Sequence, residues 1–222
     1  MSNQTAVSTL TPGDRDPFMS RVLYHLFKWL VVSPLFHTYF RGHIHGDRNL
    51  PFFGKMIFVS NHASDFDPPL LANCIRRPIA FMAKEELFRV PILGTVIRLY
   101  GAYPVKRGQA DRAALRSALA CLEEGRATGV FLDGTRRSDG RIHNPKLGAA
   151  LMAAKSQAPL VPVSLWGTHK ILPKGTKFPR PVPLTIRIGE AIAPPKSSDR
   201  AELERVTNEC AAAITALHDL GR

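Results

Sequence analysis

Short apolar runs alternate with amphipathic helical patterns along most of the chain. The runs have the length and composition of buried strands, and they fall at residues 56–59, 78–83, 102–106, 130–132 and 160–165. The clearest helical pattern covers residues 111–124, where Leu115, Leu119 and Leu122 recur on one face and Gly125 ends the helix. This alternation predicts an α/β fold, a single domain whose central sheet is mainly parallel and is flanked by helices.

Other segments complete the pattern. Further helices are predicted over residues 68–75, 84–99, 146–157 and 198–217, and residues 184–188 alternate as an edge strand does. Residues 166–181 interrupt the alternation with glycines, prolines and the bases Lys170, Lys174, Lys177 and Arg180. This basic loop is either a solvated connection or a contact for a membrane or a carrier protein.

The N-terminal part of the chain has a different pattern. Residues 1–17 are polar, do not resemble a signal peptide and are predicted to form a flexible tail. Residues 18–40 are strongly apolar, but Arg21, His25 and Lys28 recur at helical spacing and Pro34 interrupts the run. The three basic residues share a stripe, which predicts an amphipathic helical segment that lies in a membrane interface and bends near Pro34. The alternative is a helix that covers the sheet.

The charge of the chain points to an anionic partner. Thirty Lys and Arg residues against eighteen Asp and Glu residues give a net charge of +12. Three partners fit this charge: a substrate that bears a phosphate, an anionic membrane face or an acidic carrier protein. Nucleic acid is disfavoured, because the sequence has no zinc-finger spacing, no basic heptad region and no interleaved aromatic motif.

Neither the cysteines nor the histidines predict a metal site. Cys74, Cys121 and Cys210 are scattered and odd in number, which argues against both a disulfide framework and a zinc site and favours a reducing compartment. His43 and His45 lie at the two-residue spacing of one strand face, but Asp47 is the only other potential ligand nearby. We therefore interpret them as surface histidines.

A histidine and a carboxylate follow the first apolar run. His62 lies in the loop after residues 56–59, and Asp67 comes five residues later, before two prolines. A carboxylate that holds one imidazole N–H fixes the tautomer and stabilises the imidazolium, so this pair has the residue types of a general base and its orienting acid. The spacing alone leaves an alternative open, in which Asp67 is a helix N-cap and Asn61-His62 is a turn.

Four blocks of the sequence carry a resemblance to a known family. Residues 61–67 contain the His-x4-Asp spacing, and residues 101–107, 130–138 and 160–163 follow in the family's order. The chain therefore resembles the glycerolipid acyltransferases, the family of the bacterial 1-acylglycerol-3-phosphate acyltransferases. The third block departs from the usual Phe-Pro-Glu-Gly-Thr-Arg, because Leu132 replaces the proline and Asp133 the glutamate.

The resemblance implies a reaction and makes residues 41–222 the acyltransferase domain. A fatty acyl chain passes from a thioester to the sn-2 hydroxyl of lysophosphatidate, which gives phosphatidate for phospholipid synthesis. His62 takes the proton from that hydroxyl, and Asp67 holds the imidazole. No cofactor is implied; acyl-CoA or acyl-acyl carrier protein is the co-substrate, and the net charge fits either.

The predicted substrate-binding residues lie in the second and third blocks. They are Lys106, Arg107, Asp133, Gly134, Thr135 and Arg136. Arginine suits bidentate phosphate recognition, so Arg136 is the first choice for the phosphate contact and Arg107 the second. Gly134 lets backbone N–H groups approach an anion closely.

Two alternatives differ in acceptor or in class. The acceptor could be another lysophospholipid or glycerol 3-phosphate, or the chain could be a non-catalytic protein that binds anionic lipid at a membrane surface. The base and acid pair argues against the second, because a lipid-binding module does not need it. In either case the predicted location is the cytoplasmic face of a membrane, as a peripheral or monotopic protein.

Overall fold

The computed structural model describes residues 17–50, 53–75, 77–91, 93–99, 102–105, 110–173, 175–176 and 178–222. Almost all of the predicted N-terminal tail therefore lies outside the described residues. Lys106 and Arg107 of the second block also lie outside them.

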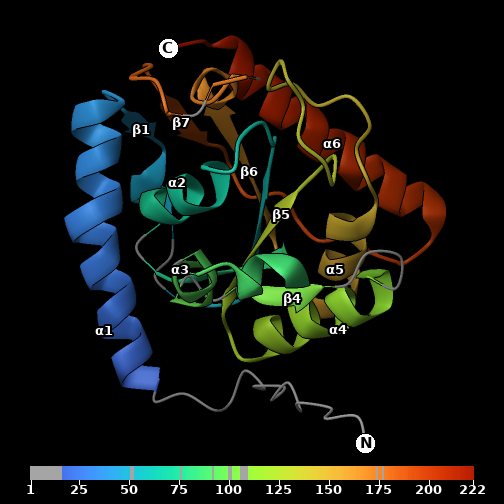
Figure 1. The fold of residues 1–222 in the computed structure, drawn as a ribbon. Helices are drawn as coiled ribbons and strands as arrows, with labels where there is room; N and C mark the ends of the chain where they lie inside the picture. Colours follow the sequence, from blue (N-terminus) through green and yellow to red (C-terminus); the bar gives the residue numbers. More distant parts are fainter. Residues whose placement is uncertain are drawn as a thin grey trace, which may run out of the picture.

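The described residues form a sheet of seven strands in the order β1-β7-β6-β2-β5-β3-β4 (Figure 1). The strands are β1 His43–His45, β2 Met56–Ser60, β3 Ile79–Lys84, β4 Tyr103–Val105, β5 Ala127–Phe131, β6 Leu160–Trp166 and β7 Thr185–Ile188. Each neighbouring pair is parallel except β6 and β7, which are antiparallel. The predicted α/β fold with a mainly parallel sheet is confirmed.

The central strand β2 explains why the first apolar run is unbroken. It pairs with β5 on one side and β6 on the other, and all five of its residues are buried. Met56 and Phe58 pack into the core on one face of the sheet, whereas Ile57 and Val59 pack into the core on the other. Because successive side chains of a strand point to opposite faces, a strand covered on both faces needs apolar residues at every position.

Helices cover both faces. The N-terminal helical segment and α2 Asp67–Cys74 pack on one face, and α4 Ala110–Glu123, α5 Gly148–Ser156 and α6 Arg200–Asp219 pack on the other (Figure 1). The helix predicted over residues 84–99 is wrong in its extent, because the 3-10 turn η4 Glu85–Arg89 precedes a separate α3 Leu93–Leu99. Pro91 lies between them; proline lacks a backbone N–H and disfavours the helical conformation in the residue before it.

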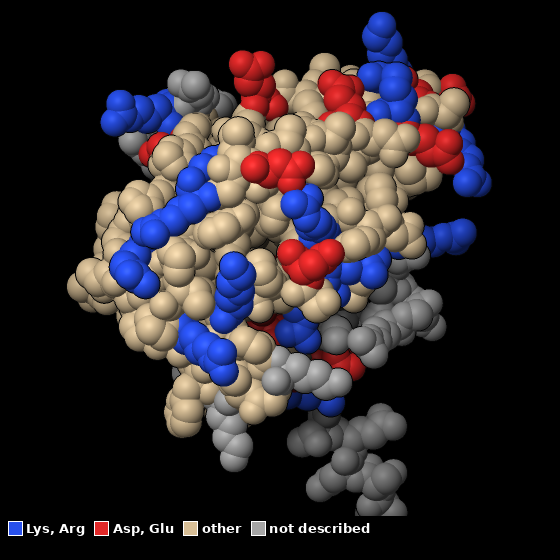
Figure 2. All heavy atoms as spheres, turned by 90° about the horizontal axis from the view of Figure 1, so that it is seen from above, with Lys and Arg blue, Asp and Glu red and all other residues tan. Residues whose placement is uncertain are grey.

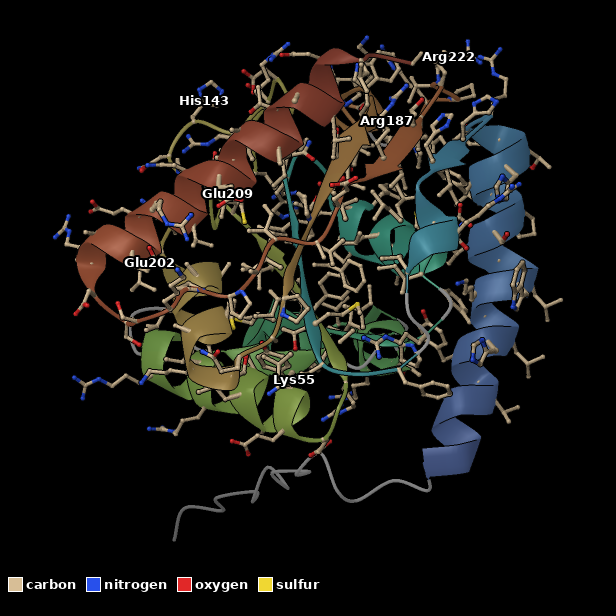
Figure 3. All side chains as sticks on the ribbon, turned by 180° about the vertical axis from the view of Figure 1, so that it is seen from behind. Lys55, His143, Arg187, Glu202, Glu209 and Arg222 are labelled. Carbon is tan, nitrogen blue, oxygen red and sulfur yellow. The ribbon has the colours of Figure 1, made fainter. Side chains whose placement is uncertain are left out.

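Strand β7 is not the edge strand that its alternation predicts. It lies between β6 and β1, so the edge on this side is the three-residue β1. The single half-buried residue of β7 is Arg187. Its side chain points toward the C-terminal end of the chain and donates to the Gly221 carbonyl (Figure 3). The alternation of β7 therefore does not reflect a free edge, since three of its four residues are buried and only Arg187 is half-buried.

The N-terminal helical segment comprises α1 Pro17–Phe27 and the π-helical turns η1 Lys28–Val32 and η2 Leu35–Tyr39, which flank Pro34. Its inward face joins the core of the sheet, where Tyr24, Phe36 and Phe40 are at most 1% exposed. The departure from α-helical hydrogen bonding begins at Lys28, before Pro34. Within the described residues, no helix has both the length and the apolar character that a membrane crossing requires.

The predicted basic stripe is wrong in its orientation at Lys28. This side chain is 3% exposed and lies against α2, because its amino group donates to backbone carbonyls there. Between residues 23 and 31 this segment exposes the apolar side chains of Leu23, Leu26, Trp29, Leu30 and Val31, whereas His37 and Thr38 are exposed near its end. The inward face covers the sheet, as the alternative interpretation of this segment predicts. The exposed apolar side chains on the other face are those that a membrane interface would contact.

Candidate active site

The predicted site loops meet at one edge of the sheet. Strands β2, β5 and β6 are parallel neighbours, so the loops that follow them leave from the same edge. The loop after β5 is fastened to the loop after β2, because Leu132 N donates to Ser60 O at 2.9 Å and Arg137 N donates to His62 O at 2.8 Å. The first and third blocks are thereby brought together.

His62 and Asp67 are in direct contact, as the sequence predicts. The Nδ1 atom of His62 lies 2.8 Å from Oδ2 of Asp67, whose side chain is fully buried, while the imidazole is 17% exposed. The same oxygen also accepts the backbone N–H groups of Ala63 at 2.6 Å and Ser64 at 2.8 Å. An ionised carboxylate can only accept, so Nδ1 carries the hydrogen and Nε2 keeps a free lone pair.

Asp67 does not act as a helix cap. It is the first residue of α2, the N-cap residue is Phe66, and the Asp67 carboxylate bonds to amides that precede it in the chain. Pro68 and Pro69 occupy the first turn, where a missing backbone N–H costs nothing. The positive end of the helix dipole favours a carboxylate here. The local turn thus holds the charged group against His62.

Two residues that the sequence analysis did not single out support the imidazole. Phe131, the last residue of β5, stacks on the His62 ring with a centroid separation of 3.9 Å and an interplanar angle of 15°. Asn61 is buried, and its amide donates to Gly140 O at 2.7 Å and Leu165 O at 3.0 Å and accepts Leu165 N at 2.8 Å. Phe131 therefore fixes the ring plane, and Asn61 ties the His62 loop to β6. In the sequence, the position of Asn61 directly before His62 was the feature that could have predicted this role.

Asp133 has a different place from the one predicted for a substrate-binding residue. Its side chain is 2% exposed, and its oxygens accept Arg137 Nε at 2.6 Å and the backbone N–H groups of His143 and Asn144 at 3.1 and 3.0 Å. These donors occupy the carboxylate, so Asp133 braces the loop over residues 133–144. The carboxylate faces inward, and the contact of Asp133 with the substrate stays a prediction from the sequence.

The other residues of the third block lie on the surface of the same loop. Gly134 has a φ of +64°, which a side chain would strain, and Gly134 and Thr135 are exposed. Arg136 is also exposed and forms an ion pair with Asp65, which lies between His62 and Asp67 in the sequence. The structure thus brings Arg136 to the loop that carries His62. The fourth block forms the buried strand β6 and contributes packing.

Two further histidines lie under the β5 loop beside Gly140. A Cβ atom at Gly140 would approach His169 Nδ1 to 3.1 Å and His218 Cε1 to 3.6 Å. Burial lowers the pKa of His169, with Lys170 acting in the same direction and Asp139 and Asp67 opposing it. Burial also lowers the pKa of His218, whose Nδ1 lies 3.2 Å from the Ser164 hydroxyl. Both imidazoles therefore favour the neutral form more than a free histidine does.

Among the described residues, no group of three or more His, Cys, Asp or Glu side chains is arranged to hold a metal ion. His43 and His45 lie on the edge strand β1 and are exposed.

A buried carboxylate that orients an imidazole at the carboxyl edge of a mainly parallel sheet defines an α/β protein with the geometry of a general-base pair. Residues 41–166 match the family described as Acyltransferase, and the chain belongs to this acyltransferase family. The resemblance drawn from the four blocks is confirmed.

Similar proteins include a chloroplastic 1-acyl-sn-glycerol-3-phosphate acyltransferase of Arabidopsis thaliana, 33% identical over 73% of this chain and 46% of that protein. A protein of the same name from Borreliella burgdorferi is 29% identical over 72% of this chain and 62% of its own length. The chain spans about half the length of the plant and algal relatives.

The fold also resembles a solved structure, the 1-acyl-sn-glycerophosphate (LPA) acyltransferase PlsC from Thermotoga maritima. The TM-score is 0.68 at 25% identity, and the match covers 90% of this chain and 97% of that one.

Proposed function

We propose that this protein transfers a fatty acyl chain from an acyl thioester to the sn-2 hydroxyl of lysophosphatidate at a membrane surface. The observation that carries the proposal is the contact of 2.8 Å between His62 Nδ1 and the buried Asp67 carboxylate. The names of the relatives and of the solved structure support the choice of acceptor. The product, phosphatidate, would enter phospholipid synthesis.

The geometry supports direct transfer with His62 as the general base. Nε2 takes the proton of the acceptor hydroxyl while its oxygen attacks the thioester carbonyl, and Asp67 stabilises the resulting imidazolium. The tetrahedral intermediate collapses as its C–S bond breaks, and the leaving thiolate takes the proton back from the His62 imidazolium to give the free thiol. A thiol has a pKa of about 8.5, so it leaves readily without a strong acid. The donor is acyl-CoA or acyl-acyl carrier protein, and no cofactor takes part.

Arg136 is the proposed contact for the acceptor phosphate. Its guanidinium lies on the loop beside His62 and is held there by Asp65. Both side chains are more than half exposed, so their ion pair is weak and a phosphate dianion can replace the carboxylate. Asp65 thus keeps the guanidinium at the site without blocking it. Lys106 and Arg107 remain proposed contacts from the sequence.

Replacing Arg136 with alanine is expected to raise the KM for lysophosphatidate by about 10- to 100-fold, because a hydrogen-bonded contact to a charged group contributes roughly 1.5 to 3 kcal/mol. The kcat at saturating acceptor should change far less. Steady-state kinetics over a range of acceptor concentrations measure both values.

Arg141→Ala is the matched control for Arg136→Ala. Arg141 lies farther along the same loop and forms a similarly exposed ion pair with Asp219. The KM of the Arg141→Ala variant for lysophosphatidate should equal that of the wild type. An equal rise in KM for the two variants would assign the effect to net charge and remove the specific role of Arg136.

The proposed membrane-docking surface has two parts. One is the apolar outward face of the N-terminal helical segment. The other is formed by the described residues 171–173, 175–176 and 178–183, among which Leu172 and Phe178 are exposed and Pro179 O accepts the Tyr39 hydroxyl at 2.8 Å. That hydrogen bond places the loop beside the end of η2, so the two parts are adjacent.

The charge around this surface fits an anionic bilayer. Residues 17–46 and 140–189 contain no Asp or Glu. Figure 2 shows basic side chains among uncharged ones on the left part of the upper face, the side on which α1 and β1 lie in Figure 1. Apolar side chains flanked by bases are typical of interfacial binding. We place the protein on the cytoplasmic face of a membrane, as a peripheral or monotopic protein.

Replacing Trp29 and Leu30 with serine should weaken binding to vesicles of phosphatidylcholine and phosphatidylglycerol about tenfold or more, because each buried large apolar side chain contributes roughly 1.5 to 3 kcal/mol.

Raising the salt concentration should weaken wild-type binding as well, since exposed charges are screened beyond about 8 to 10 Å. Vesicle sedimentation measures both effects.

Leu220→Ser, at an exposed residue after α6, is the control for the vesicle experiment and should bind as the wild type does. If Trp29 and Leu30 can be replaced without loss of binding, the outward face of the helical segment is not the docking surface.

The function is tested by acyl transfer from coenzyme A and carrier-protein thioesters to lysophosphatidate, lysophosphatidylcholine and glycerol 3-phosphate. The expected result is transfer to lysophosphatidate with the highest kcat/KM. Preference for another acceptor would correct the substrate. Vesicle binding without transfer to any acceptor would favour the non-catalytic lipid-binding alternative.

A further inference from the structure

Two side chains of the N-terminal helical segment hold the far end of α2. The Lys28 amino group donates to Ile75 O at 2.5 Å and to Ala72 O at 3.4 Å. The Tyr24 hydroxyl donates to Ala72 O at 3.1 Å and to Arg77 O at 3.4 Å. Tyr24 and Lys28 are 1% and 3% exposed, and their contacts with Ala72 and Ile75 are buried, whereas the contact with Arg77 is partly buried.

One of these carbonyls, that of Ala72, belongs to the last turn of α2, and that of Ile75 belongs to the C-cap residue. The last carbonyls of an α-helix have no partner within it, and a basic group near them also interacts favourably with the negative end of the helix dipole. Ala72 and Ile75 are buried, at 0% and 2% exposed. A buried carbonyl without a donor costs free energy, so the contacts fix where the C-terminal end of α2 can lie.

The opposite end of the same helix begins with Asp67. Helix α2 has only eight residues, Asp67–Cys74, which corresponds to a length of about 12 Å. So short a helix moves as one body. Any shift of its C-terminal end therefore changes the position of the Asp67 carboxylate against His62 and against the amides of Ala63 and Ser64.

We propose that Lys28 and Tyr24 are positioning residues that set the contact between Asp67 and His62 through α2. The expected loss of acyl transfer rests on the proposed function, whereas the expected change in the contact between Asp67 and His62 does not. Trp29 and Leu30 follow Lys28 directly and belong to the outward apolar face, with exposures of 62% and 72%. The segment proposed to dock on the membrane is thus joined by hydrogen bonds to the helix that carries the acid.

The test uses Lys28→Met and Tyr24→Phe in the full chain, with Lys155→Met on the exposed surface of α5 as the control. At saturating donor, Lys28→Met should lower kcat by about 10- to 100-fold, as expected when a catalytic pair is misplaced by a fraction of an ångström to an ångström. The KM for lysophosphatidate should stay within about twofold, because Arg136 is untouched. Tyr24→Phe should show a smaller loss of the same kind, and the control none.

A spectroscopic measurement separates this inference from the function. In protein labelled with [15N]histidine, the hydrogen-bonded Nδ1–H of His62 gives a signal that is assigned by its loss in His62→Gln. The signal should shift or broaden in Lys28→Met and stay unchanged in Lys155→Met. Tyr24→Phe removes one oxygen atom, so it supplies a folded variant if Lys28→Met does not fold.

The outcomes are distinguishable. A folded Lys28→Met protein with wild-type kcat and an unchanged His62 signal would overturn the inference. A lower melting temperature with both readouts unchanged would also overturn it, since Lys28 would then be structural only. If the wild type transfers no acyl chain, the function fails, while the His62 signal still decides whether Lys28 positions Asp67.

Discussion

Replacing His62 with alanine is expected to lower kcat for acyl transfer by about 10³-fold, because general-base catalysis contributes roughly 10²- to 10⁴-fold. The imidazole is the group whose free Nε2 can take the acceptor proton, since Nδ1 is held by Asp67. The side chain is partly exposed, so its removal should leave the folded state intact. Initial rates at saturating lysophosphatidate and thioester measure the loss.

A second histidine-carboxylate pair in the same protein provides the control for His62→Ala. His143 Nε2 lies 2.7 Å from Asp139 Oδ2, but both side chains are about half exposed and lie on the surface of the β5 loop. Figure 3 labels His143 at this loop. His143→Ala should keep the wild-type kcat. If it lost as much activity as His62→Ala, the general base would have been assigned to the wrong pair.

Asp67→Asn is expected to lower kcat by about 10²- to 10⁴-fold while preserving the shape of the site, as a lost orienting carboxylate does in related base-acid arrangements. An asparagine oxygen can still accept the N–H groups of Ala63 and Ser64, so the turn should persist. The negative charge that stabilises the imidazolium is lost, and the amide can also face His62 with its NH2 group, which selects the wrong tautomer.

For Asp67→Asn, the melting temperature and kcat are measured together. Asp139→Asn, in the exposed pair, is the control and should change neither. A variant with wild-type kcat would show that Asp67 only shapes the turn. A variant that is inactive because it has unfolded would be recognised by its melting temperature, and Asp67→Glu would then test whether a displaced carboxylate restores part of the rate.

In the third block, the sequence and the structure give different views of Asp133. The sequence places Asp133 beside Gly134 and Arg136 and therefore among the substrate contacts. In the structure its carboxylate turns inward to Arg137 and to the backbone of His143 and Asn144. Asp133 thus braces the loop that carries Arg136.

The sequence by itself determined the features that depend on near neighbours. Strands β2 and β6 are apolar runs because both of their faces are covered, so period and length reveal them. The run predicted at 130–132 marks only the end of β5, which begins at Ala127 and contains Thr128 and Gly129. The contact between His62 and Asp67 spans five residues and is closed by a local turn with its own hydrogen bonds. Features of this kind depend on residues that are close together in the chain, so the sequence alone predicts them.

Tertiary structure decided the features that join distant parts of the chain. Asn61 bonds to Leu165, and Lys28 bonds to Ile75, across separations of 104 and 47 residues. The sequence shows that Arg21, His25 and Lys28 recur at helical spacing. Whether Lys28 points inward or outward depended on the carbonyl groups of Ala72 and Ile75, which accept its amino group. Likewise β7 became an interior strand because β1 pairs with its free edge. Periodicity defines the faces of a helix or strand, and only the partners brought by folding decide which face is inward.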